Sequence, residues 1–594
     1  MKNEGNKHND IAFWIVLVLA AVLYLAFLEL NKNMLFGWGL TALLITGFVT
    51  QRRKTRYRGI PLRLGTWAGF FLLLWVIGMI SWPPVRTVPA TDHISGCTEP
   101  VQTQYGPVSG VISEEKGIEV YAGIPYAEPP VGELRWKKPR DPEPWTDVLV
   151  CDQFAAMSMQ SVNIPLMDSL AQIIGYHDYQ FSMDDHYRPP VSEDSLYLNI
   201  WKPAGKQEKL PVAVYIHGGS LQTGQPWYAD YSGEGYAKSG VICVNMGYRL
   251  GVFGFLADEE MLSEEGTAGN FGLLDQIKAL QWVQDNIEAF GGDPNNVTLI
   301  GESAGAVCVD ALCVSPLAEG LFQRAILESS TLSSPQPPHS YRSFADALAS
   351  GKALKEKYGC ETLAELRDLP ASKITGEMET QHHVTADGYV LADDPYELRK
   401  QGVHNEQAIL HGFNDQESGP FIIFSRANKK NYEEKVRRYF GEYTDDVLAL
   451  YPASTDAEAD RNWAEIYGAL FFNYSHYCLN RLAAQENIPV YEYLFTKQNG
   501  RLSSWHSGEM VYTFGVIPEE SDLYDYEDRR LSEIMHTFWV NFITTGNPNG
   551  EELPDFEENT TSEKIMVFGE TEEMRSEPYL KLYEILDRMT GFKN

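Results

Sequence analysis

Long apolar runs dominate the first 82 residues of the chain. They occupy Ile11–Leu28, Met34–Thr50 and Gly65–Trp82 and are 18, 17 and 18 residues long, without a charged residue. Because a helix of about 20 apolar residues spans the hydrocarbon core of a bilayer, the pattern predicts three transmembrane helices at 11–28, 34–50 and 65–82. The second run contains three glycines and is the weakest of the three. A cleaved signal peptide for the first run and buried core hairpins for the others are the alternatives.

The loop between the second and third runs predicts the orientation. It carries six Lys or Arg residues and no acid, and such loops are enriched on the cytoplasmic side. With three crossings the N-terminus is also cytoplasmic; if the second run does not cross, the N-terminus is outside. In both cases only the third run separates the basic loop from the rest of the chain. We therefore expect a multi-pass cell-membrane protein with a cytoplasmic N-terminus and an extracytoplasmic domain.

Beyond the membrane segment, 1–82, the pattern changes to short apolar runs. A linker at 83–100 carries Pro83, Pro84 and Pro89 and is typical of a semi-rigid spacer. The remaining chain, 101–594, is long for one domain but within the range of a large α/β enzyme. Its runs are continuous rather than alternating, which is typical of strands covered on both faces. The predicted strands are Val212–Ile216, Val241–Met246, Val297–Ile300, Ala325–Leu327, Ala408–Leu410 and Val490–Phe495.

A helix is predicted between the second and third of these strands. Apolar residues recur at intervals of three or four from Leu273 to Phe290, and Gly291 and Gly292 then end the helix. Strand, helix and strand in this order indicate the α/β class, with a mostly parallel central sheet covered by helices.

Charge and cysteine content exclude some classes of function and of site. The chain carries a formal charge of −33, and residues 1–90 carry +7, so the remainder carries −40. Such a domain repels a phosphate backbone, and we expect no nucleic-acid partner. The seven cysteines show neither a disulfide framework nor metal-site spacing. Cys243 and Cys308 lie in apolar runs and are expected to be buried.

A nucleophile motif follows the predicted strand Val297–Ile300. Gly301-Glu302-Ser303-Ala304-Gly305 has the form G-x-S-x-G, and a potential helix comes next. In this context the chain turns sharply and exposes the serine at the end of the sheet, with glycines leaving room on both sides. Ser303 is therefore the candidate nucleophile.

Donors for a developing oxyanion are expected upstream of this motif. His217-Gly218-Gly219 directly follows the strand Val212–Ile216. Acyl transfer needs N–H groups at the tetrahedral intermediate, and Gly218, Gly219 and Ala304 are in place to supply them. An ordinary glycine turn is the alternative for Gly218 and Gly219.

An acid and a base are expected downstream, in the order Ser, acid, His. Gly412–Ser418, after the strand Ala408–Leu410, contains Asp415 and Glu417, and a later loop contains His506. Order and loop context favour Glu417 and His506, although spacing alone leaves the other 12 histidines open.

At this point the sequence resembles the type-B carboxylesterase and lipase family of α/β-hydrolases, from about Tyr105 to Phe568. The resemblance implies an α/β-hydrolase fold, a triad of Ser303, His506 and Glu417, and an oxyanion hole at Gly218, Gly219 and Ala304, with no cofactor and no metal. Glu302 matches a common family residue without a triad role. The segments that carry the resemblance are Tyr121–Trp136, Glu193–Asn199, Asn245–Gly251, Gly269–Gln276, Gly301–Gly305, Gly412–Ser418, His506–Gly515 and Trp539–Asn549.

The chain departs from the family pattern in two places. Where many secreted relatives have a disulfide, it has Ser195 and, in the partner segment, Ser158. Loss of both halves resembles the bacterial, para-nitrobenzyl-esterase-like members. The second departure is a long stretch, Ser161–Pro190, expected either to border the substrate pocket or to be a surface insertion. It has no tryptophan, which argues against choline esters.

These observations predict hydrolysis of a small-molecule carboxylic ester through an acyl-enzyme, by a protein held on a lipid bilayer. A membrane-tethered lipase acting on long-chain glycerides is the first alternative. A cell-surface adhesion protein is the second, disfavoured because all three triad residues are present.

Overall fold

The computed structural model describes residues 2–55, 59–161, 166, 188–205, 209–335, 337, 340–559, 561 and 563–593. The chain divides into two compact units, Met1–Arg86 with Val162–Pro190, and Thr87–Ser161 with Val191–Asn594. The division falls inside the expected linker, 83–100, and the end of that segment contributes strand β1 (Gly96–Cys97) to the second unit. Apart from residues 161, 166 and 188–190, the stretch 161–190 lies outside the described residues.

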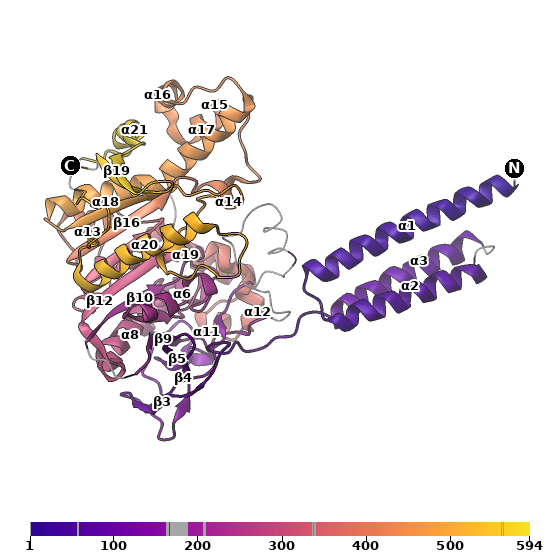
Figure 1. Ribbon diagram of the computed structural model, residues 1–594, viewed down its shortest axis with the longest axis horizontal. Coiled ribbons are helices and arrows are strands. Elements are labelled where there is room, and N and C mark those ends of the chain that lie inside the picture. Colours follow the sequence, from indigo (N-terminus) through magenta and orange to yellow (C-terminus); the bar gives the residue numbers. More distant parts are fainter. Residues whose placement is uncertain are drawn as a thin grey trace. The chain divides into compact units, whose positions relative to one another are not determined.

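The first unit contains three long helices that lie side by side (Figure 1), namely α1 (Lys2–Leu30), α2 (Leu35–Thr55) and α3 (Ile60–Ile80). The Phe13 ring of α1 lies 5.4 Å from the Trp67 ring of α3. Farther along the same two helices, the Tyr24 hydroxyl donates a hydrogen bond to the Leu74 carbonyl. Helices α1 and α3 are therefore parallel, and α2, which lies between them in the chain, runs in the opposite direction.

Two of these helices have the length and hydropathy of a membrane span, at Ile11–Leu30 and Ile60–Ile80. Among the described residues, α2 does not meet that test, so the expectation of three such helices is corrected to two. The reason is its sequence, because α2 ends in the polar run Gln51–Thr55 and includes three further threonines. Its apolar run is helical as expected, but it is less apolar than its neighbours.

The second unit is built on a large mixed sheet. The seven central strands, from β11 to β18, are parallel, and the flanking strands are antiparallel. This is the mostly parallel sheet that the sequence predicts. In spatial order its strands are β1, β4 (Val111–Ser113), β5 (Ile118–Pro125), β9 (Tyr197–Pro203), β11 (Ile242–Met246), β10 (Leu210–Ile216), β12 (Gly292–Glu302), β13 (Arg324–Glu328), β16 (Ala408–Asn414), β17 (Val490–Phe495), β18 (Lys564–Phe568) and β19 (Glu573–Ser576).

Both faces of the central strands are buried, which explains their continuous apolarity. In β10, Val212, Val214 and Ile216 belong to one hydrophobic cluster, whereas Ala213 and Tyr215 belong to another. Helices α8 (Phe271–Asn286) and α9 (Ala304–Cys313) cover the first face, and α20 (Tyr526–Thr545) covers the second. The six predicted strands and the helix at 273–290 are therefore confirmed.

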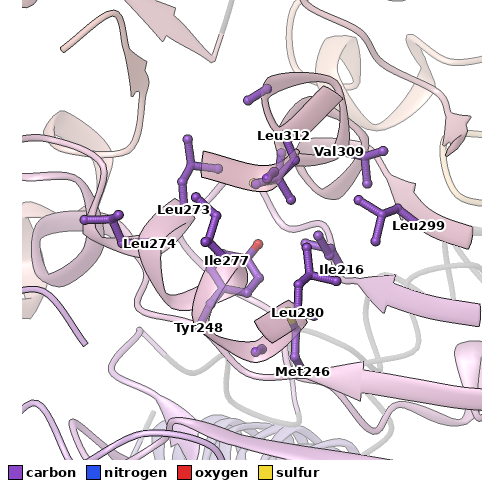
Figure 2. Close-up of a cluster of buried hydrophobic side chains, with 14 of the residues drawn as sticks. Ile216, Met246, Tyr248, Leu273, Leu274, Ile277, Leu280, Leu299, Val309 and Leu312 are labelled. Carbon is purple, nitrogen blue, oxygen red and sulfur yellow. The ribbon is translucent and has the colours of Figure 1, made fainter. Parts of the chain in front are cut away.

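Figure 2 shows the first of these faces in detail. Ile216 on β10 and Leu299 on β12 point toward Ile277 of α8 and Val309 of α9. Burying an aliphatic side chain of this size contributes roughly 1.5–3 kcal/mol. This packing fixes the carboxyl ends of the strands, from which the candidate site residues extend.

Candidate active site

Ser303 lies at a sharp turn between strand β12 and helix α9. Its backbone has φ 55° and ψ −124°, a conformation that side-chain-bearing residues rarely adopt. A Cβ on Gly301 would lie 2.4 Å from the backbone of Gly305, and a Cβ on Gly305 would lie 2.0 Å from the Ile216 carbonyl oxygen. The two glycines of G-x-S-x-G are therefore required by close backbone packing, which holds the serine in its strained conformation.

The three expected oxyanion donors surround this turn. Gly218 lies beside it, since a Cβ there would be 3.1 Å from the Ser303 Cβ. Gly219 has a φ of 102°, which favours glycine. Ala304 begins α9, so its N–H lies at a helix N-terminus, where anions are favoured. In the described part of the chain, none of these three N–H groups donates a hydrogen bond to a protein acceptor.

The structure brings Glu417 and His506 together. His506 Nδ1 and Glu417 Oε2 are 2.6 Å apart, and both side chains are buried. The other carboxylate oxygen of Glu417 accepts a hydrogen bond of 2.8 Å from the Asn414 N–H. Because Nδ1 donates to the carboxylate, the neutral imidazole carries its lone pair on Nε2, the nitrogen that a general base uses.

Two loops hold this pair in register. The acid loop follows β16 and the histidine loop follows β17, and an isolated parallel bridge joins Gln416 to Trp505. The Asn414 side chain also donates a hydrogen bond of 2.6 Å to the Trp505 carbonyl. Strands β12, β16 and β17 are parallel members of one sheet, so the three loops meet at the same edge.

Glu302 lies close to the imidazole of His506, which its position in the sequence did not indicate. Its Oε1 lies 3.4 Å from His506 Nε2 and accepts a hydrogen bond of 2.6 Å from the Ser507 hydroxyl. Burial raises the pKa of Glu302, while His506 and Ser507 oppose that rise. The imidazole thus has one carboxylate at each of its nitrogens.

These carboxylates determine the charge state of the histidine. Burial alone would lower the pKa of His506, but Glu417 and Glu302 outweigh it and raise the pKa to about 9. A third carboxyl, Glu509, follows His506 by three residues and accepts a hydrogen bond of 3.0 Å from the Ser329 hydroxyl. Burial, with Glu417 and Glu302, raises the pKa of Glu509 to about 8. Glu509 lies in the segment His506–Gly515 that carries the family resemblance, and its sequence position alone predicts no role for it.

Two aromatic rings contact His506. The Phe421 ring lies 5.1 Å from the imidazole in an edge-to-face arrangement, and the Phe472 ring lies 4.9 Å away. Phe421 is 41% exposed, whereas Phe472 is buried. Phe421 follows Glu417 by four residues, but Phe472 comes from another segment, so no local pattern could have linked the two to the histidine.

Three other histidines are buried but differently arranged. Burial lowers the pKa of His217 to about 4. His411 and His476 pair with each other through their Nδ1 atoms at 2.9 Å. None of the three is hydrogen-bonded to a carboxylate among the described residues. Nor do those residues contain a cluster of His, Cys, Asp and Glu side chains arranged to hold a metal ion.

The two serines at the expected disulfide positions lie together. Their hydroxyl oxygens are 3.0 Å apart, and the Ser158 hydroxyl also donates to the Tyr248 carbonyl at 2.6 Å. All seven cysteines lie in the described part of the chain and are free, and Cys243 and Cys308 are buried as expected. A hydrogen bond therefore lies at the position where the family resemblance implies a disulfide in many secreted relatives.

Comparison with known proteins identifies the family. Residues 98–585 match the model of the carboxylesterase family. The chain is 31% identical to the para-nitrobenzyl esterase of Bacillus subtilis over 490 residues, which cover 78% of this chain and 94% of the relative. It is 31% identical to rat (Rattus norvegicus) carboxylesterase 1C over 538 residues, which cover 84% and 94% of the two chains.

Solved structures give the same result for the fold. The carboxylesterase EST55 of Geobacillus stearothermophilus aligns with a TM-score of 0.69 and 29% identity, over 82% of this chain and all of that one. A thermophilic para-nitrobenzyl esterase aligns with a TM-score of 0.70 and 27% identity, over 82% of this chain and 99% of its own. The chain is thus a carboxylic ester hydrolase of the carboxylesterase family, with the α/β-hydrolase fold.

Proposed function

We propose that the protein hydrolyses small-molecule carboxylic esters through an acyl-enzyme on Ser303. His506 Nε2 takes the proton from the Ser303 hydroxyl as the oxygen attacks the ester carbonyl carbon, and Glu417 stabilises the resulting imidazolium. The imidazolium then gives its proton to the departing alkoxide, which leaves the acyl group on Ser303. Water, deprotonated by the same nitrogen, attacks the acyl-enzyme and releases the acid.

The observation that carries this proposal is the buried contact of 2.6 Å between His506 Nδ1 and Glu417 Oε2. It fixes the ring so that Nε2 is the basic nitrogen. The strained turn at Ser303, between glycines that admit no side chain, supports the role of that serine. A turn of this kind is maintained where function requires an exposed nucleophile.

The N–H groups of Gly218, Gly219 and Ala304 form the proposed oxyanion hole. Their lack of protein acceptors among the described residues supports this role, because preorganised donors stabilise the intermediate without rearrangement. The helix N-terminus at Ala304 adds a favourable dipole.

The test uses the full chain in detergent and p-nitrophenyl esters of increasing acyl length. We expect turnover of short-chain esters that falls by about six orders of magnitude in Ser303→Ala. A rate maximum at long chains, increasing at an interface, would instead favour the lipase alternative. Folded protein without serine-dependent turnover of any ester would favour the adhesion alternative.

We also infer that the first unit anchors the enzyme in a membrane. Helices α1 and α3 have the length and hydropathy of a span and pack in parallel. The basic loop at 51–64 favours the cytoplasmic side for the ends of α2 and α3 that it joins, and an extracytoplasmic catalytic unit.

Protease added to intact cells tests this topology. We expect the catalytic unit to be degraded while a cytoplasmic marker survives. Survival of the catalytic unit under conditions that cleave an external control would contradict the orientation.

A further inference from the structure

A cavity opens between the three helices of the first unit, at the end that carries the basic loop. Its volume is about 320 Å³, within the range of small-molecule sites. Residues from all three helices form its wall. They are Ala12, Phe13 and Val16 of α1, Phe48, Gln51 and Arg52 of α2, and Arg63, Thr66, Trp67 and Phe71 of α3.

Two arginines give the cavity a positive end. The Arg52 guanidinium lies 3.7 Å from the centre of the Phe13 ring, which holds it against the cavity wall. Arg63, from the first turn of α3, lines the same cavity and is half-buried. In the described part of the chain, Arg63 forms no ion pair with a carboxylate. Arginine forks match the geometry of a phosphate group.

The rest of the cavity is aromatic and apolar. The Phe48 ring lies 4.8 Å from the Trp67 ring, and Trp67 stacks on Phe71 at 5.7 Å. Phe71 lies eight residues beyond Arg63 in the same helix, so the cavity wall extends about 12 Å along the bundle. A polar ligand group at the arginines would thus be continuous with an apolar portion farther along the helices.

We propose that this cavity binds the headgroup of an anionic phospholipid. Its phosphate lies between Arg52 and Arg63, and its acyl chains follow the exposed apolar surface beside Val16 and Phe71. The proposal rests on the membrane attachment inferred above. That attachment places the cavity at the cytoplasmic leaflet, where anionic lipids carry the negative charge.

Charge complementarity is the reason to expect tighter binding of an anionic lipid than of a zwitterionic lipid. The last turn of α2, at the cavity, contains three basic residues, and their charge favours a net negative headgroup. The apolar portion of the cavity favours a lipid over free phosphate, because an inorganic ion makes no contact with the aromatic wall.

The helix α2 offers a matched control. Arg53 and Lys54 directly follow Arg52 and are exposed, and neither lines the cavity. The cavity variant is the double substitution Arg52→Gln with Arg63→Gln, and it removes two positive charges from the cavity. The control variant is the double substitution Arg53→Gln with Lys54→Gln, and it removes two positive charges outside the cavity.

The test is native mass spectrometry of the full chain released from detergent, titrated with phosphatidylglycerol or phosphatidylcholine. We expect one phosphatidylglycerol to be retained by the natural protein, and to bind ten- to a hundredfold more weakly to the cavity variant than to the control variant. Thr66→Phe, which fills the cavity without changing charge, is expected to weaken binding in the same way. Equal loss in the two charge variants would overturn the proposal, because binding would then be diffuse.

Two further arms complete the test. Displacement of phosphatidylglycerol by millimolar inorganic phosphate would also overturn the proposal, since the site would then be one for a simple anion. Retention of the natural protein in carbonate-washed membranes reports on the membrane attachment separately. Hydrolysis of p-nitrophenyl butyrate reports on the catalytic site and is expected to be unchanged in all three variants.

Discussion

The pH dependence of the enzyme offers a sharp test of the residues around His506. Its Nε2 atom must be unprotonated to act as a base, yet Glu302 Oε1 lies 3.4 Å away and favours the protonated ring. The substitution Glu302→Gln removes that charge while keeping the shape and an oxygen that can accept from Ser507. The pKa of His506 should therefore fall.

The distance gives the magnitude. Two unit charges 3.4 Å apart interact by about 1 kcal/mol at the dielectric constant of water and by about 5 kcal/mol at an effective value of about 20. Since one pKa unit corresponds to about 1.4 kcal/mol, the pKa of His506 should fall by roughly 1 to 3.5 units. The acid limb of kcat/KM should move to lower pH by the same amount.

The assay follows kcat/KM for p-nitrophenyl butyrate between pH 5 and pH 10 in the natural protein and in Glu302→Gln. Asp415→Asn is the matched control, because Asp415 is a neighbouring carboxyl whose hydrogen-bonding partner is Ser504 rather than His506. An acid limb that stays in place in Glu302→Gln, or moves equally in the control, would refute the reasoning.

Three further predictions concern a serine pair, two buried histidines and an oxyanion-hole glycine. The pair Ser158→Cys, Ser195→Cys should form a disulfide on oxidation and raise the free energy of unfolding by about 4 kcal/mol for a separation of 37 residues, as measured by urea unfolding with and without reductant. Burial lowers the pKa of His411 to about 3 and that of His476 well below its usual value. Their contribution to stability is therefore complete above about pH 6.5 and is lost as the pH falls below it, by about 2 kcal/mol each at pH 5. In His476→Gln, the free energy of unfolding measured by urea titration should therefore fall between pH 7 and pH 5 by about 2 kcal/mol less than in the natural protein. An equal fall in the two proteins would contradict this prediction. Gly218→Ala places a Cβ 2.7 Å from the Glu302 carbonyl oxygen and should lower kcat by about a hundredfold or more, which steady-state kinetics on p-nitrophenyl butyrate checks.

The central sheet could be predicted because its signals are local. Strands covered on both faces have continuous apolar runs, and the helix at 273–290 repeats at three and four residues, so each element is visible within its own segment. Ser303 was recognisable for the same reason, since its strand, turn and helix are consecutive. Glu417 and His506 are 89 residues apart, and chain order in the fold, rather than spacing, linked them.

Contacts between distant segments account for what the sequence did not predict. The Glu302 carboxylate returns to His506 across 204 residues of chain, and Phe472 comes from a different helix region than Phe421. Neither relation leaves a periodic signal. The N-terminal helices show the opposite error, because the run at 34–50 was counted as a span although the threonines of α2 and the polar run that ends it lower its hydropathy.

The central claim is that Ser303 is the nucleophile that carries the acyl group. Peptide mass spectrometry after brief exposure to a fluorophosphonate, which reacts with activated serines, tests it most directly on the full chain in detergent. The account predicts a stoichiometric adduct on the peptide containing Ser303, lost in Ser303→Ala and strongly slowed in His506→Ala. An adduct on another residue, or equal labelling of Ser303→Ala, would contradict it.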